Sequence, residues 1–129
     1  MLKRMIVALA IAAPGCMPTL AQAQQLIGSY VALLSERDHF NSNGVRLASA
    51  AAIIRQDRAN FHRFGIRDPE DQDDPFFGDE GNRAALEQML ERGHADPGVV
   101  ARIVNDVVLI KVDIYRDDGS VFIRVMLLR

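Results

Sequence analysis

The sequence has little of the chemistry on which common enzyme motifs depend. Among its 129 residues are one cysteine, Cys16, three histidines and no tryptophan. A single cysteine excludes an intrachain disulfide and any site built from several thiolates. Gly-x-Ser-x-Gly, His-Glu-x-x-His and the phosphate-binding glycine loop are also missing. The best-known hydrolase, metalloprotease and nucleotide-binding motifs are thereby excluded, and we predict no cofactor.

A long apolar run is missing as well. The run near the start covers nine residues, 5–13, whereas a membrane-spanning helix needs about 20. Basic residues precede it at 3–4 and small residues follow it at 21 and 23, which is the pattern of a secretory signal peptide. We therefore predict a cleaved signal peptide, 1–23, and one globular domain, 24–129. The mature protein is expected to be exported, periplasmic or secreted, without a transmembrane segment.

Cys16 gives an alternative to this prediction. Bacterial lipoproteins are cleaved before a lipidated cysteine, and residues 13–16 (Ala-Pro-Gly-Cys) partly match that pattern. Ala13 and Pro14 depart from it. A lipoprotein anchored at Cys16 is therefore the alternative to a soluble exported domain.

Charge is unevenly distributed in the predicted mature chain. Without residues 1–23 the chain keeps 13 of its 15 basic residues and all 17 acidic ones, so its net charge is −4. Seven of those acids lie within 68–80. Because phosphate neutralisation dominates affinity for nucleic acid, an exported chain with net negative charge predicts no nucleic-acid partner.

Helical periodicity appears in the middle of the chain. We predict helices over 50–64, 83–92 and 96–105, with Ser49 and Asn82 capping the first two. A glycine follows each of these two helices, where a left-handed residue is favoured. The apolar stripe expected on the first helix consists of Leu47, Ala50, Ile54, Phe61 and Phe64.

Alternation of apolar and polar residues marks the strands. The run 26–35 fits either a strand or a helical face, and we favour a strand because the apolar run is short. The runs 108–115 and 121–127 flank Asp118-Gly119, a strong hairpin turn. The sequence therefore predicts a small single α+β domain in which two to three helices precede a C-terminal antiparallel hairpin, joined by an N-terminal strand. The predicted cross-strand pairs are Ile114–Ile123, Val112–Val125, Ile110–Leu127, Asp113–Arg124 and Tyr115–Phe122.

The second face of this hairpin is too apolar for a solvent-facing surface. We expect a helix or the first strand to cover it, and the alternative is a partner surface, including a homodimer formed through the hairpin. The residues on this face are Leu109, Tyr115, Phe122, Met126 and Leu128.

The segment 55–65 carries most of the candidate functional groups. Arg55, Arg58 and His62 are spaced three and four apart, so they predict either an anion-binding helix face or a solvated one. Asp57 falls on the apolar stripe. We interpret it as a buried structural ion-pair residue, with Arg46 or Arg83 as partner, and the alternative is a general base. All three histidines have polar neighbours and are expected at the surface.

The acidic stretch 68–80 is the candidate metal site. Its carboxylates suit Ca²⁺, but their spacing does not match an EF-hand, and prolines stiffen the path. We predict a solvated connector, pinned to the core by Phe76 and Phe77, whose acids at 71, 73 and 74 face Arg63 or Arg67. The candidate ligands for the alternative are Asp68, Glu70, Asp71, Asp73 and Asp74.

These observations predict a small secreted or periplasmic non-enzymatic domain that acts through contacts with a protein or a cell-envelope component. One alternative is a divalent-cation (Ca²⁺) binding protein that uses the loop 68–80. The other is a small periplasmic hydrolase that uses Asp57 and His62. A cleft with these two side chains within hydrogen-bonding distance would favour the hydrolase, and converging carboxylates would favour the metal.

Overall fold

The computed structural model describes residues 8–16 and 24–129. Part of the predicted signal peptide, including the cleavage position after Ala23, lies outside the described residues. Cys16 is described and is a free, exposed cysteine. Among the described residues, no helix has both the length and the apolar character needed to cross a membrane.

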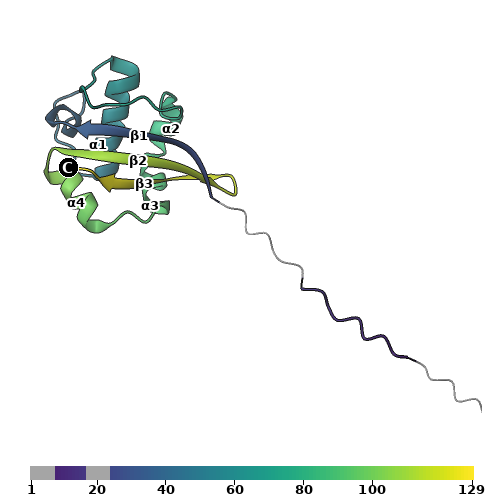
Figure 1. The fold of residues 1–129 in the computed structure, drawn as a ribbon. Helices are drawn as coiled ribbons and strands as arrows, with labels where there is room; N and C mark the ends of the chain where they lie inside the picture. The colour runs from purple at the N-terminus through teal and green to yellow at the C-terminus, as the bar shows by residue number, and fades with distance from the viewer. Residues whose placement is uncertain (1–7, 17–23) are drawn as a thin grey trace, which may run out of the picture.

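A three-stranded antiparallel sheet forms one layer of the molecule (Figure 1). Its strands are β1 (Gln25–Leu34), β2 (Val108–Asp117) and β3 (Ser120–Leu127), with β2 in the centre. The predicted N-terminal strand and hairpin are confirmed, and so is the register, in which all five predicted pairs occur. Asp118 and Gly119 both have positive φ, as a type I′ turn requires.

Helices form the second layer, against one face of the sheet (Figure 1). This is the small α+β domain that the sequence predicts. The helices are η1 (Glu36–His39), α1 (Ala50–Ala59), η2 (Asn60–Phe64), α2 (Glu80–Ala84), α3 (Leu86–Arg92) and α4 (Pro97–Asn105).

The predicted helix ends are confirmed in part. Ser49 accepts a hydrogen bond from the Ala52 N–H, and Asp96 caps α4 in the same way. The predicted cap at Asn82 is wrong. Asp79 caps the helix instead, because its carboxylate accepts the Asn82 N–H at 2.9 Å, and the helix breaks at Ala85 into α2 and α3.

One position of the predicted apolar stripe is also wrong. Phe64 is 47% exposed, although Ala50, Ile54 and Phe61 are buried. The cause is η2, a π-helical turn in which the Gly65 N–H reaches the Asn60 carbonyl five residues back. The wider turn directs the side chain of its last residue, Phe64, away from the stripe.

The outer face of the sheet is not covered as expected. Met126 and Leu128 are 43% and 48% exposed, because the helices lie on the other face and β1 pairs with β2 within the sheet. Tyr115 and Phe122 shield each other by stacking, with 5.3 Å between ring centroids. The guanidinium of Arg124 lies over both rings.

The loop after η2 runs along the edge of the sheet formed by β1, on the side away from β2. The Gln72 N–H donates to the Val31 carbonyl at 2.8 Å, and the Val31 N–H donates back to Oε1 of Gln72 at 3.0 Å. Farther along the strand, the Leu33 N–H donates to Oδ1 of Asp71 at 2.9 Å. Phe76 and Phe77 then pack on the core, as predicted.

Candidate functional site

A buried charge cluster lies between α1 and the acidic loop. It consists of Asp57, Arg58, His62 and Asp74. Arg58 is completely buried, with its guanidinium 4.0 Å from the ring centroid of Tyr30 and 4.6 Å from that of Phe61. Its Nε donates to Asp57 Oδ2 at 2.8 Å, and its Nη1 donates to Asp74 Oδ1 at 2.9 Å. Two carboxylates therefore share one buried cation.

Asp74 is the better stabilised of these two carboxylates. Its Oδ2 accepts the backbone N–H groups of Phe76 and Phe77, and its Oδ1 accepts from Arg58 and from Nε2 of His62 at 2.7 Å. Burial alone would raise the pKa of Asp74. The hydrogen bonds from Phe77, His62, Phe76 and Arg58 together outweigh burial and lower the pKa below its ordinary value.

Asp57 lies in the opposite environment. It is 1% exposed, and its carboxylate accepts one hydrogen bond, from Arg58, while Oδ1 has no partner among the described residues. Burial therefore raises its pKa well above the ordinary range, and Arg58 offsets this only in part. The partner of Asp57 is its own neighbour, Arg58, and neither Arg46 nor Arg83.

The geometry does not bring together the two side chains of the hydrolase alternative. His62 bonds to Asp74, Asp57 bonds to Arg58, and among the described residues no hydrogen bond joins Asp57 to His62. Burial of Arg58 also separates it from Arg55, which is exposed. Arg55, Arg58 and His62 therefore do not share an exposed anion-binding face.

The candidate calcium ligands are not arranged around one point. Asp68 pairs with Arg37 at 3.1 Å, Asp71 accepts from the backbone of β1, and Glu70 faces Arg129 at 3.9 Å. The side chain of Asp73 is 81% exposed, and its Oδ1 lies 3.9 Å from Nδ1 of His62. The predicted solvated loop is correct for Asp73 and wrong for Asp71 and Asp74.

A smaller metal cluster was not predicted. One ligand atom each from His62, Asp73 and Asp74 lies within 4.8 Å of the others. Both oxygens of Asp74 already accept two hydrogen bonds, and the Arg58 cation lies 2.9 Å away. A metal ion would have to displace His62 from Asp74 and overcome the arginine charge, so this arrangement suits an ion-pair network better than a cation.

Histidine burial also differs from the prediction. His39 is buried, with its Nδ1 2.7 Å from the Ser35 carbonyl and its Nε2 2.8 Å from the Ile103 carbonyl. The ring therefore joins η1 to α4. His62 is half-buried, and only His94 is exposed as expected.

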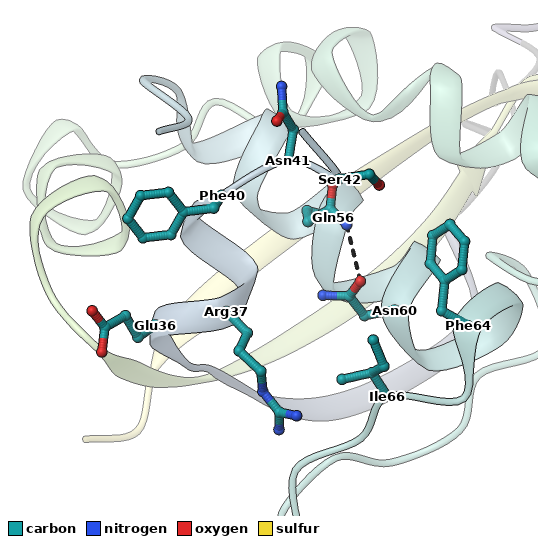
Figure 2. A pocket seen from close by; sticks show the side chains of 9 residues that line it. All are labelled: Glu36, Arg37, Phe40, Asn41, Ser42, Gln56, Asn60, Phe64 and Ile66. Atoms are coloured by element: carbon teal, nitrogen blue, oxygen red, sulfur yellow. Dashed lines mark hydrogen bonds between the residues drawn. The ribbon is translucent and has the colours of Figure 1, made fainter. Parts of the chain in front are cut away.

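An open groove on the surface is the candidate binding site (Figure 2). It has a volume of about 620 Å³ and lies between η1, the turn that follows it and the end of α1. Its apolar walls are Phe40, Phe64 and Ile66, and Phe64 and Ile66 are 47% and 40% exposed. Figure 2 shows Phe40 and Phe64 on opposite sides of the groove.

Polar side chains line the groove between these walls. Nε2 of Gln56 donates to Oδ1 of Asn60 at 2.9 Å, the bond drawn in Figure 2. Nδ2 of Asn60 in turn donates to the buried Oδ1 of Asp38 at 2.9 Å. Glu36 and Arg37 also line the groove. The hydrogen bonds fix the polar groups in place, so the groove is largely preformed.

The π-helical turn η2 contributes two residues to the lining of this groove. It starts at Asn60, which faces the groove, and ends at Phe64, which forms one wall. The sequence signal was present in the four-residue spacing of Gln56 and Asn60, which places an amide pair on one helix face. The exposure of Phe64 had no such signal, because a regular helix would bury it.

No family model matches the chain, and neither a curated protein nor a solved structure matches it.

Proposed function

We propose that the protein is an exported, non-enzymatic binding domain that contacts a cell-envelope component through the groove between Phe40 and Phe64. The observation that supports this best is the exposure of Phe64 and Ile66 at a preformed hollow. Large apolar side chains gathered at a concave site are typical of ligand binding. Export follows from the signal-peptide pattern of residues 1–23.

The polar side chains of the groove also favour binding over catalysis. Asn60 and Gln56 donate to oxygen acceptors of their own neighbours, so they are positioned as a rigid surface. The carboxylates with shifted pKa values, Asp57 and Asp74, are both directed at Arg58 and do not line the groove. The charge cluster therefore supports the helix end that carries the groove.

A neutral fluorescent probe tests this proposal. Purified protein titrated with N-phenyl-1-naphthylamine should increase the probe's emission with saturable, one-site binding. Phe64→Ser and Ile66→Ser should each weaken binding about tenfold, the effect expected when one large apolar contact is lost. Both side chains are already partly exposed, so neither change should alter the far-ultraviolet circular dichroism spectrum.

Met126→Ser is the matched control, because Met126 is similarly exposed but lies on the outer face of the sheet. It should leave probe binding unchanged. Loss of binding in Met126→Ser together with normal binding in Phe64→Ser would place the binding surface on the sheet and refute the proposal for the groove.

A further inference from the structure

A second hollow adjoins the groove on the other side of Phe64. It has a volume of about 330 Å³ and shares Ser42, Gln56 and Phe64 with the groove. Its character is different, because Arg55, Arg63 and Arg83 line it together with a single acid, Glu80. One continuous surface therefore runs from apolar walls to a basic hollow.

Two of these arginines are not paired with a carboxylate among the described residues. Among the residues that the structure describes, neither Arg55 nor Arg63 forms an ion pair or a side-chain hydrogen bond, and both are exposed. The guanidinium of Arg63 lies over the Phe64 ring, 5.1 Å from its centroid, at the boundary between the two hollows. Both side chains are therefore available to a ligand that also contacts Phe64.

The third arginine fixes positive charge at the same place. Arg83 is buried, and its Nη1 donates to the carbonyls of Phe77 at 2.8 Å and Gly78 at 3.1 Å. Neither partner is a carboxylate, so the charge of Arg83 is held in position without being neutralised by these contacts. Against these three cations, Glu80 supplies the one negative charge that lines the hollow.

We propose that the ligand of this surface is an anionic amphiphile, an apolar chain that ends in a carboxylate. The inference rests on the proposed function, since the chain would occupy the groove between Phe40 and Phe64. The carboxylate would bind Arg55 and Arg63, whose planar guanidinium groups match carboxylate oxygens in pairs. A single negative charge suits the hollow better than a phosphate dianion, because Glu80 lines it too.

Displacement of N-phenyl-1-naphthylamine from the purified protein by three ligands of equal chain length tests this inference. We expect dodecanoate to displace the probe at about tenfold lower concentration than dodecan-1-ol, the factor that corresponds to about 1.4 kcal/mol. Dodecyltrimethylammonium should be weaker than the alcohol. The advantage of dodecanoate should shrink as salt is added, because both arginines are exposed to solvent.

Variants assign the effect to the two exposed arginines. Arg55→Gln and Arg63→Gln should each reduce the advantage of dodecanoate over dodecan-1-ol, and the double variant should abolish it, while all three still bind the probe. Arg116→Gln is the matched control, because Arg116 is exposed on β2 and lines neither hollow. It should keep the full advantage.

Several outcomes would overturn the inference. Equal displacement by dodecanoate and dodecan-1-ol would show an apolar groove without anion selectivity, and the proposed function would survive. An equal loss in Arg116→Gln would reveal a nonspecific effect of net charge. Tighter binding of dodecyl phosphate than of dodecanoate would refute the carboxylate assignment. Absence of probe binding in the unmodified protein would instead refute the proposed function.

Discussion

Asp57 and Asp74 share the guanidinium of Arg58 but occupy opposite environments. Asp74 receives four hydrogen bonds, and Asp57 receives one. We expect Asp74→Asn to lower the free energy of unfolding by about 3 kcal/mol, the range for breaking a buried ion pair. Asp57→Asn should cost clearly less, because an amide has the shape of the neutral acid that burial favours. Urea denaturation at pH 7 measures both values.

The pH dependence of stability distinguishes the contributions of Asp74 and Asp57. The lowered pKa of Asp74 adds stability above the ordinary pKa of aspartate, about 4, and that stability is lost as the pH falls through the lowered value. The raised pKa of Asp57 has the opposite sign. Its stabilising contribution is present below about pH 4 and is lost as the pH rises through the raised value.

Relative to the unmodified protein, Asp74→Asn should therefore be least harmful in acid. Asp57→Asn should become least harmful as the pH rises. Parallel pH profiles for the two variants would show that the carboxylates are equivalent and would contradict this assignment.

The sequence could reveal the burial of Asp57 but not its partner. A charged residue on an apolar stripe of a helix must be desolvated, and that much follows from periodicity. Adjacent helix residues do not usually face each other, which made Arg58 an unexpected partner. The long arginine side chain reaches Asp57 because Tyr30 and Phe61, far apart in the chain, enclose its guanidinium. Only the tertiary fold brings these rings together.

At the scale of elements, the end of α3 packs tightly against β3. A Cβ atom added at Gly93 would lie 1.8 Å from the Ile123 carbonyl oxygen, which is backbone and has little room to move. We expect Gly93→Ala to lower the free energy of unfolding by about 2 kcal/mol or more, as overpacking does. Thermal or urea denaturation measures the change.

Gly78→Ala is the matched control for Gly93→Ala. A Cβ atom there would have its nearest neighbour at 3.7 Å, an ordinary contact. This variant should keep nearly full stability. If Gly93→Ala were equally tolerated, α3 and β3 would have to be more loosely packed than the distance implies.

Some elements were predictable residue by residue, and others were not. The hairpin was predictable residue by residue, because strict alternation and the Asp118-Gly119 turn together fix one register. The helix over 83–92 was predicted as one piece from its apolar face, and nothing in that pattern indicated the Asp79 cap or the break at Ala85. The π-helical turn η2 had no sequence signature, and it moved Phe64 from the expected core into the groove wall.

At the scale of the whole molecule, the sheet begins just after the predicted cleavage position. β1 starts at Gln25, and Gln24 accepts a hydrogen bond from Nη2 of Arg124 at 3.2 Å. Removal of residues 1–23 therefore takes no residue from the sheet. We expect protein recovered from the bacterial periplasm to begin at Gln24, as measured by mass spectrometry of the intact chain.

Two results bear on this expectation about export. Ala23→Arg should prevent cleavage after residue 23, because the peptidase requires a small residue there. A lipid-modified chain that begins at Cys16 would instead establish the lipoprotein alternative and contradict a Gln24 terminus.

The groove and the basic hollow could not be assembled from the sequence. Phe40, Arg63 and Glu80 belong to three separate segments, and none of them carries a motif. Arg55 was a candidate for anion binding from the start, but its expected neighbours, Arg58 and His62, were the wrong ones. Spacing along a helix indicates which side chains share a face, and packing decides which of those faces remains open.

The loop that pairs with β1 has a consequence for the addition of another chain at this edge of the sheet. An unpaired edge strand can template the addition of another chain, which leads to aggregates and fibrils. Here Gln72 and Asp71 already occupy backbone groups of Val31 and Leu33, so an incoming strand would find those positions filled. It would also meet the carboxylates of the loop before it reached the backbone. The acidic stretch that resembled a metal site therefore covers these backbone groups of β1.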